Sequence, residues 1–308
     1  MNAALTKTMQ TLDQLQAFAI DDRLTFRSGP GGLLHADIVA ADGRASLSLQ
    51  GAQLTHFQPA AQSAPLLWLS PRARHAAQRP IRGGVPVCWP WFGAHASDTS
   101  LPLHGYARVA PWELIDSACV DGRVQLTLRM RADEATRLVW PHETPLELYV
   151  EVGDAVSIEL TTINAAEVPV KLGEALHAYF TVGDVEQVEV LGLAGARYLD
   201  KTLGFAEARQ NGALRIAGET DRVYLDTEAR CSIVDPLLGR RIVIDKSGSS
   251  STVVWSPGEQ RGAEMADIGS AHWRGMLCVE SANAAANALT LQPGELHTLA
   301  VRYAAESL

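Results

Sequence analysis

The sequence is poor in cysteine and in positive charge, and it has no long hydrophobic run. The four cysteines follow no CxxC or repeated spacing, which favours buried free thiols in a reducing compartment over disulfides or a thiolate metal site. A formal net charge of −9 over 308 residues argues against nucleic acid or an anionic membrane as the main partner. No stretch reaches the length of a membrane span, and the N-terminus lacks a signal-peptide pattern. We therefore expect a cytoplasmic protein.

Several catalytic and nucleotide-binding motifs are also missing. The chain contains neither GxGxxG nor GxxxxGK[ST], so a nucleotide cradle has no support. GxSxG is absent too, and the serine-rich stretch 246–252 is typical of a solvated hairpin turn. The histidines never occur as HxH or HxxxH, which leaves a metal site without local support. The sequence thus predicts neither a metal nor an organic cofactor.

Alternation of apolar and polar residues with period two dominates the chain. In 124–130, Val124, Leu126 and Leu128 point to one face and the polar residues between them to the other. Similar segments, several of them apolar on both faces, occur at 45–50, 147–152, 156–162, 241–247, 251–257, 276–281 and 297–303. Helical periodicity is confined to the first twenty residues and to 131–140, too little for a doubly wound α/β fold. The pattern predicts an all-β protein, a large antiparallel β-sandwich with few short helices.

No linker or break in composition divides the chain. We expect residues 1–20 to form an N-terminal extension, with a short helix that places Leu12, Leu15 and Phe18 on one face. Residues 21–308 are predicted to form a single β-sandwich domain, a size that such folds commonly reach.

Three features could carry chemistry. His177 lies in the strand-like segment EALHAYF (174–180), where a lone histidine is more often structural. Glu280 follows a continuous apolar run, and a buried carboxylate is costly unless it is hydrogen-bonded or functional. The third feature is a pair of loops, 79–93 and 104–114, which are rich in arginine, glycine and aromatic residues.

Taken in order, these segments resemble one enzyme family. The motifs are RGGVP…PWFG, HGYAR…PW, LHAYF, TDRVY and VESA. Each is weak alone, but the ordered set resembles the hexose-6-phosphate mutarotases, or glucose-6-phosphate 1-epimerases, within the wider aldose 1-epimerase group. The resemblance runs from about residue 30 to the C-terminus. It implies a galactose-mutarotase-like β-sandwich with an open sugar groove and a sugar phosphate as small-molecule substrate. We expect a monomer.

The resemblance also implies roles for particular residues. Anomer exchange needs one general base and one general acid near neutral pH, and Glu280 matches the family's base and His177 its acid. Arg82 and Arg108 match substrate-contacting arginines, and a guanidinium suits a phosphate dianion.

Asp221 matches an acceptor for sugar hydroxyls, and His104 matches a second histidine of the pocket. Gly83 and Gly84 would let the loop backbone approach the ligand. Trp89 and Trp91 are expected in the core. The chain departs from the family at Leu103, where a glutamine usually contacts the substrate.

Two other functions remain open. An aldose 1-epimerase acting on unphosphorylated sugar would need the acid–base pair but not the arginines. A carbohydrate-binding protein without catalysis would have no use for both His177 and Glu280.

Overall fold

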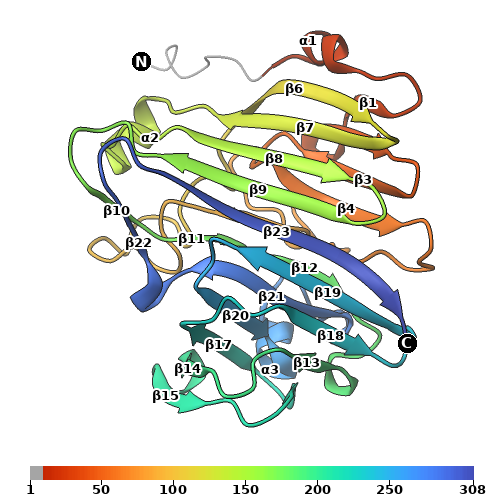
Figure 1. Ribbon diagram of the computed structural model, residues 1–308, viewed down its shortest axis with the longest axis vertical. Coiled ribbons are helices and arrows are strands. Elements are labelled where there is room, and N and C mark those ends of the chain that lie inside the picture. The colour runs from red at the N-terminus through yellow and green to blue at the C-terminus, as the bar shows by residue number, and fades with distance from the viewer. Residues whose placement is uncertain (1–9) are drawn as a thin grey trace.

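The alternating segments form strands in the computed structural model of the protein, which describes residues 10–308 (Figure 1). Every strand predicted from period two is present, with bounds within a few residues of the expected ones. In β7 the side chains of Val124, Leu126 and Leu128 are fully buried. These strands are β3 (Gly43–Ser48), β7 (Arg123–Met130), β8 (Leu146–Val152), β9 (Val156–Ile163), β19 (Arg240–Ser247), β20 (Ser251–Ser256), β21 (Met276–Asn283) and β23 (Leu296–Ser307).

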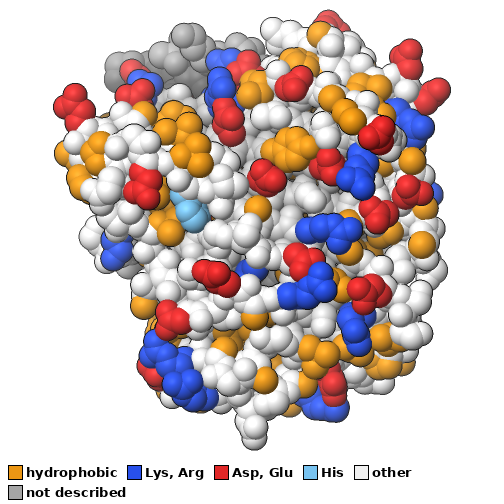
Figure 2. All heavy atoms as spheres, viewed as in Figure 1, with side chains coloured by type: hydrophobic (Ala, Val, Ile, Leu, Met, Phe, Trp, Pro, Cys, Tyr) orange, Lys and Arg blue, Asp and Glu red, His pale blue; other side chains and the backbone are white. Residues whose placement is uncertain are grey.

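A nine-stranded antiparallel sheet faces the viewer in Figure 1. Its order is β16–β13–β18–β19–β23–β9–β8–β7–β6, which adds β6 (Trp112–Val120), β13 (Glu189–Leu191), β16 (Leu214–Arg215) and β18 (Cys231–Asp235). Cross-strand ion pairs such as Arg129–Glu147 and Arg123–Glu151 lie on its outer face. Acidic and basic side chains are interspersed over this face in Figure 2. The face is therefore suited to contact with water.

An eight-stranded sheet forms the second layer and carries the candidate site. Its order is β15–β14–β17–β20–β21–β11–β5, and β12 also pairs with β21. The new strands are β5 (Val87–Cys88), β11 (Glu174–Leu176), β12 (Tyr179–Thr181), β14 (Arg197–Asp200), β15 (Ala206–Arg209) and β17 (Thr220–Leu225). The rings of Phe180 on β12 and Tyr303 on β23 meet edge to face, with centroids 5.1 Å apart. Such contacts make the two sheets a β-sandwich, as predicted.

The remaining strands form two smaller sheets. They comprise β1 (Leu24–Ser28), β2 (Leu34–Val39), β3 and β4 (Gln53–Pro59), and the pair β10 (Val170–Leu172) and β22 (Leu289–Leu291). The Val85 amide donates to the Leu54 carbonyl at 2.8 Å, which fixes the loop after Arg82 against β4. Gly84 has φ +63°, and a Cβ there would lie 2.2 Å from the Leu54 oxygen. The close approach at this glycine is thus between two backbone segments.

The helices are few and short. Residues 12–18 form α1 (Leu12–Leu15) and a 3₁₀ turn, η1 (Gln16–Phe18), which confirms the N-terminal helix; residues 1–9 of the predicted extension lie outside the described residues. The helical segment predicted at 131–140 contains α2 (Glu134–Val139), and α3 (Gly258–Glu264) was not predicted. Among residues 10–308, no helix is long and apolar enough to cross a membrane.

Burial agrees with most expectations for particular side chains. Trp89 and Trp91 are core residues, with 0% and 8% of their surface exposed. The four cysteines are free, and Cys88, Cys231 and Cys278 are buried as expected. Cys119 is exposed, so the expectation of burial was wrong for this residue, which lies near the solvated end of β6.

The serine-rich stretch 246–252 is not a solvated hairpin turn. It leads from β19 in the nine-stranded sheet to β20 in the eight-stranded sheet, and Ser249 and Ser251 are buried. The Lys246 ammonium donates to the carbonyl oxygens of Thr227 and Ser251, both at 2.8 Å. The small serines and the lysine therefore satisfy polar groups where the chain crosses between layers.

We expect Lys246→Met to destabilise the protein by about 1–3 kcal/mol, because the buried carbonyl oxygens would lose their donor. Urea denaturation of the variant and the wild type measures this difference. Lys171→Met, at an exposed position, is the matched control and should change the stability little. Equal stability of the two variants would contradict the structural role of Lys246.

Candidate active site

His177 and Glu280 face each other across neighbouring strands of the eight-stranded sheet. Leu176 pairs with Ser281 and Tyr179 with Cys278, so the register places His177 opposite Glu280. The distance from His177 Nδ1 to Glu280 Oε1 is 3.4 Å. The two residues are only 7% and 1% exposed. The strand register therefore creates a buried pair of one imidazole and one carboxyl group.

Backbone contacts fix the segment that carries His177. It lies in the gap between β11 and β12, and its amide donates to the Pro86 carbonyl at 3.0 Å. The Tyr179 amide donates to the Gly84 carbonyl at 2.9 Å. The segment is thus held between β21 and the loop that follows Arg82, so His177 and this loop keep a defined relative position.

Burial disfavours the charged form of both groups in the pair. It lowers the pKa of His177, and the nearby charges of Arg108 and Arg82 lower it further. It raises the pKa of Glu280, with a further rise from Asp221. Both shifts favour a neutral imidazole beside a carboxylic acid over an ion pair. Such a pair can accept a proton at one group and donate one at the other.

Aromatic rings determine the orientation of His177. The Tyr179 ring stacks on it with centroids 4.9 Å apart and an interplanar angle of 5°. The rings of His104 and Trp255 meet it edge to face at 5.5 and 6.4 Å. Residues 177 and 179 are two apart in a strand-like segment, and such residues lie on the same face. This stacking could therefore have been anticipated from the sequence. The imidazole has little freedom to turn.

The two predicted arginines lie beside the pair. Arg82 donates from Nε to Asp267 at 3.0 Å and from Nη1 to the Tyr179 hydroxyl at 2.8 Å. Arg108 is half-buried and donates to the backbone carbonyl of Leu103 at 2.5 Å. Arg82 thus contacts the ring that stacks on His177, and the charges of both arginines lower the pKa of His177. Arg82 is the more engaged of the two, and its partner Asp267 had no signal in the sequence.

Leu103, which departs from the family pattern, lies at the rim of the site. Its side chain is 58% exposed, and its backbone oxygen accepts the hydrogen bond from Arg108. The residue therefore orients an arginine through a group that does not depend on its side chain.

Asp221 is paired with a cation that the sequence analysis missed. The Lys201 ammonium lies 2.7 Å from Asp221 Oδ2. Lys201 begins η4 (Lys201–Leu203), and the preceding Asp200 caps this turn by accepting from the Thr202 amide at 3.1 Å. Asp200 thus has a structural role and positions its neighbour.

His104 lies at the turn that leads to Arg108. Its φ is +63°, and the next residue, Gly105, has φ +69°. A Cβ on Gly105 would lie 1.9 Å from the Trp89 carbonyl oxygen, so only glycine fits this position. Burial lowers the pKa of His104 to about 3, so its ring is neutral.

The structure thus brings together all six predicted residues, with Lys201, Tyr179 and Asp267 in addition.

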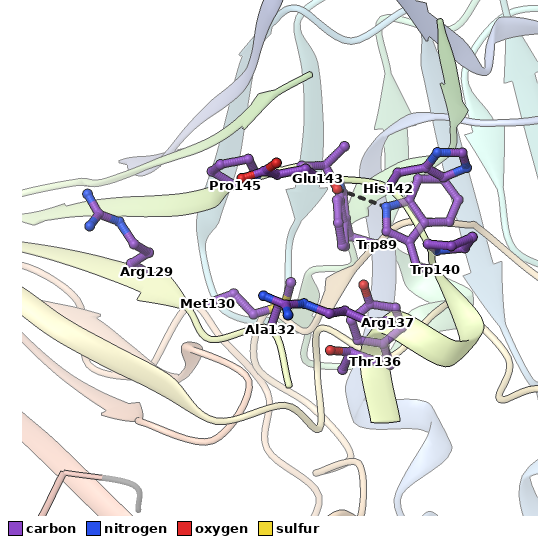
Figure 3. A pocket seen from close by; sticks show the side chains of 13 residues that line it. Trp89, Arg129, Met130, Ala132, Thr136, Arg137, Trp140, His142, Glu143 and Pro145 are labelled. Atoms are coloured by element: carbon purple, nitrogen blue, oxygen red, sulfur yellow. Dashed lines mark hydrogen bonds between the residues drawn. The ribbon is translucent and has the colours of Figure 1, made fainter. Parts of the chain in front are cut away.

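A separate pocket of about 650 Å³ lies between α2 and the ends of β7 and β8 (Figure 3). Trp140, Arg137 and His142 line it, and the Trp140 indole donates to the Thr144 hydroxyl at 2.8 Å. None of the six predicted residues lines this pocket. The predicted residues therefore lie apart from this hollow.

Comparisons with known proteins show the family of the chain. The family described as "Aldose 1-epimerase" matches residues 38–304. A protein of Salmonella typhimurium named "Putative glucose-6-phosphate 1-epimerase" is 36% identical over 280 residues, which cover 89% of this chain and 92% of the relative. One of Escherichia coli with the same name is 37% identical over 246 residues, 78% of this chain and 80% of the relative.

Solved structures show the same fold. The crystal structure of a "putative mutarotase" from Salmonella typhimurium superposes with a TM-score of 0.86 at 32% identity, and covers 96% of this chain and 99% of its own. A galactose mutarotase-like protein from Lactobacillus casei has a TM-score of 0.69 at 16% identity, with 88% and 99% covered.

The β-sandwich and its match to a mutarotase structure define a galactose-mutarotase-like enzyme. Within that class, the chain belongs to the aldose 1-epimerase family.

The strand that leads to His177 is stabilised by a second histidine–carboxylate pair. Glu174 on β11 is fully buried, and its Oε1 lies 3.0 Å from His297 Nε2. The Asn283 side chain also donates to Glu174 Oε1, at 2.9 Å. The hydrogen bond with Glu174 raises the pKa of His297. This pair ties β11 to the strand β23 of the other sheet.

A group with a raised pKa in the folded state adds stability below its unfolded pKa. The contribution of His297 is therefore complete below pH 6.5, its ordinary value, and is lost as pH rises through the folded-state pKa. We expect the stability difference between wild type and His297→Gln to shrink over that window, as measured by urea denaturation at several pH values. His272→Gln is the control for the loss of an imidazole, and the same trend in both variants would contradict the assignment.

Proposed function

We propose that this chain interconverts the α and β anomers of a hexose 6-phosphate, with glucose 6-phosphate as the expected substrate. The observation that carries the proposal is the buried His177–Glu280 pair, 3.4 Å apart, beside Arg108 and Arg82. The names of the relatives support the choice of substrate.

The reaction opens and recloses the sugar ring. A general base removes the proton from the C1 hydroxyl, the bond from C1 to the ring oxygen breaks, and a general acid protonates that oxygen. The open-chain aldehyde rotates about its C1–C2 bond, and the ring closes with the two roles reversed. In ring opening the base gains one proton and the acid loses one. Ring closure reverses both transfers, so the pair returns to its original state after the full cycle.

In the proposed cycle, Glu280 is the base and His177 the acid. Burial in the free protein favours the proton on Glu280. Sugar oxygens that hydrogen-bond to the charged forms favour a carboxylate and an imidazolium. We propose that substrate binding moves the proton to His177 and so creates the reactive state. Asp221, with Lys201 beside it, would accept hydrogen bonds from sugar hydroxyls, and the neutral His104 would line the pocket.

The phosphate is assigned mainly to Arg108. Its only hydrogen bond within the described residues is to the Leu103 carbonyl, which leaves further donors of the guanidinium for a ligand. Arg82 already donates to Asp267 and Tyr179, so it has fewer donors to offer. Because Arg82 already has two protein partners, a second candidate function is an aldose 1-epimerase that acts on unphosphorylated sugar. The buried acid–base pair argues against a purely carbohydrate-binding protein.

We also propose that residues 21–308 act as one catalytic domain, monomeric and cytoplasmic. One continuous apolar core links strands of the large sheets and supports a single domain. The interspersed charges on the face in Figure 2 support a monomer, because stable interfaces are usually less charged at their centre. Four free thiols fit a reducing compartment.

We expect Glu280→Gln and His177→Ala to fold and to lose anomer exchange by about 10²–10⁴-fold each, the usual contribution of a positioned acid or base. Exchange spectroscopy by NMR on glucose 6-phosphate measures the rate, and circular dichroism checks the fold. Glu259→Gln, at an exposed position, should exchange at the wild-type rate. Near-wild-type exchange by either folded site variant would refute the acid–base roles.

Arg108→Ala distinguishes the two candidate substrates. Loss of charge-assisted hydrogen bonds to a phosphate should lower kcat/KM for glucose 6-phosphate by about 10–100-fold, with little change for glucose. Arg137→Ala, an exposed arginine of the pocket in Figure 3, is the control and should leave both values unchanged. An equal loss on both sugars would show that Arg108 does not bind a phosphate.

A further inference from the structure

A third polar side chain lies beside the acid–base pair and takes no part in the proposed reaction. Cys278 precedes Glu280 by two residues on β21, so both side chains point to the same face of the sheet. The Cys278 thiol, the His177 imidazole and a Glu280 oxygen lie within 4.8 Å of one another. All three residues are at least nine-tenths buried.

These atoms match the coordination chemistry of zinc. In a tetrahedral site, Zn–N and Zn–O bonds of about 2.0–2.2 Å and Zn–S bonds of about 2.3 Å put neighbouring ligands about 3.3–3.6 Å apart. The distance from His177 Nδ1 to Glu280 Oε1 is 3.4 Å, within that range. The three ligand atoms all lie within 4.8 Å of one another, so small side-chain rotations would bring them to the separations that zinc requires.

The pair also has unused binding capacity. His177 Nδ1 and Glu280 Oε2 are buried and have no hydrogen-bond partner among the described residues. A buried polar atom without a partner is costly, so these two favour any ligand that can reach them. A thiolate and a carboxylate together neutralise a divalent cation, which offsets the repulsion from nearby Arg82, Arg108 and Lys201.

We propose that His177, Cys278 and Glu280 form an inhibitory site for Zn²⁺, with water as the fourth ligand. Binding forms bonds from the metal to the His177 imidazole, the Cys278 sulfur and the Glu280 carboxylate, and the thiol and the carboxylic acid release their protons to solvent. The metal occupies both catalytic groups, so it competes with the sugar.

Metal binding is tested without reference to activity. Calorimetry with ZnCl₂ on the full chain should give one site in the wild type and at least a tenfold weaker one in Cys278→Ser, since even second-shell changes cost about 10–100-fold. Cys231→Ser, which alters a buried thiol outside the cluster, should bind like the wild type. Co²⁺ provides a second readout, because its thiolate complexes absorb in the near ultraviolet and this band should vanish only in Cys278→Ser.

A second experiment measures inhibition by Zn²⁺, and only this experiment depends on the proposed function. ZnCl₂ should slow anomer exchange by the wild type, glucose 6-phosphate should relieve the inhibition, and Cys278→Ser should exchange normally but resist Zn²⁺. If the wild type exchanges no anomers yet binds the metal through Cys278, the proposed function fails and the metal site stands. Unchanged affinity in Cys278→Ser, or equal loss in Cys231→Ser, would overturn the site. If Cys278→Ser does not fold, Cys278→Ala replaces it, and failure of the sugar to weaken Zn²⁺ binding to the wild type overturns the proposal.

Discussion

The site depends on one constraint, the antiparallel register between β21 and the chain segment that contains β11 and β12. This register sets His177 opposite Glu280 at 3.4 Å and buries both. A shift by one residue would turn one side chain to the other face of the sheet, because side chains alternate along a strand. The pair therefore exists only while the pairing on both sides of it is maintained, and the core beneath the sheet maintains that pairing.

Around this pair, loops from distant parts of the chain provide the charges. The loop with Arg82 is fastened to β4 by backbone hydrogen bonds, and the turn with His104 and Arg108 crosses the Trp89 carbonyl at a position that only glycine can occupy. Burial in the sheet disfavours the charged forms of His177 and Glu280. The charged groups around the pair come from the loops.

Much of the fold was predictable because strands of a sandwich alternate regularly between core and solvent. The strand at 124–130 was recognised in this way, the strand at 276–281 was recognised from its continuous apolar run, and the motif order indicated His177 and Glu280. Features that depend on contacts across the fold were not predictable. The stretch 246–252 has the composition of a solvated turn, yet it crosses between layers because Lys246 and the serines satisfy buried carbonyl groups.

The same limit applies to the site. Asp267 approaches Arg82 from a loop with no pattern of its own, and the pairing of Lys201 with Asp221 follows from the packing of η4 on β17. In contrast, the stacking of Tyr179 on His177 follows from their spacing, since two residues apart on a strand share a face.

The hydrogen bond from Arg108 to the Leu103 carbonyl has a consequence for how such a site can diverge. Every amino acid has the same backbone oxygen, so the orientation of the arginine survives any substitution at position 103 that preserves the turn. The side chain there is exposed at the rim and can change freely in size and polarity. The side chain at the rim of the site can thus diverge between relatives while the orientation of the neighbouring guanidinium is inherited unchanged.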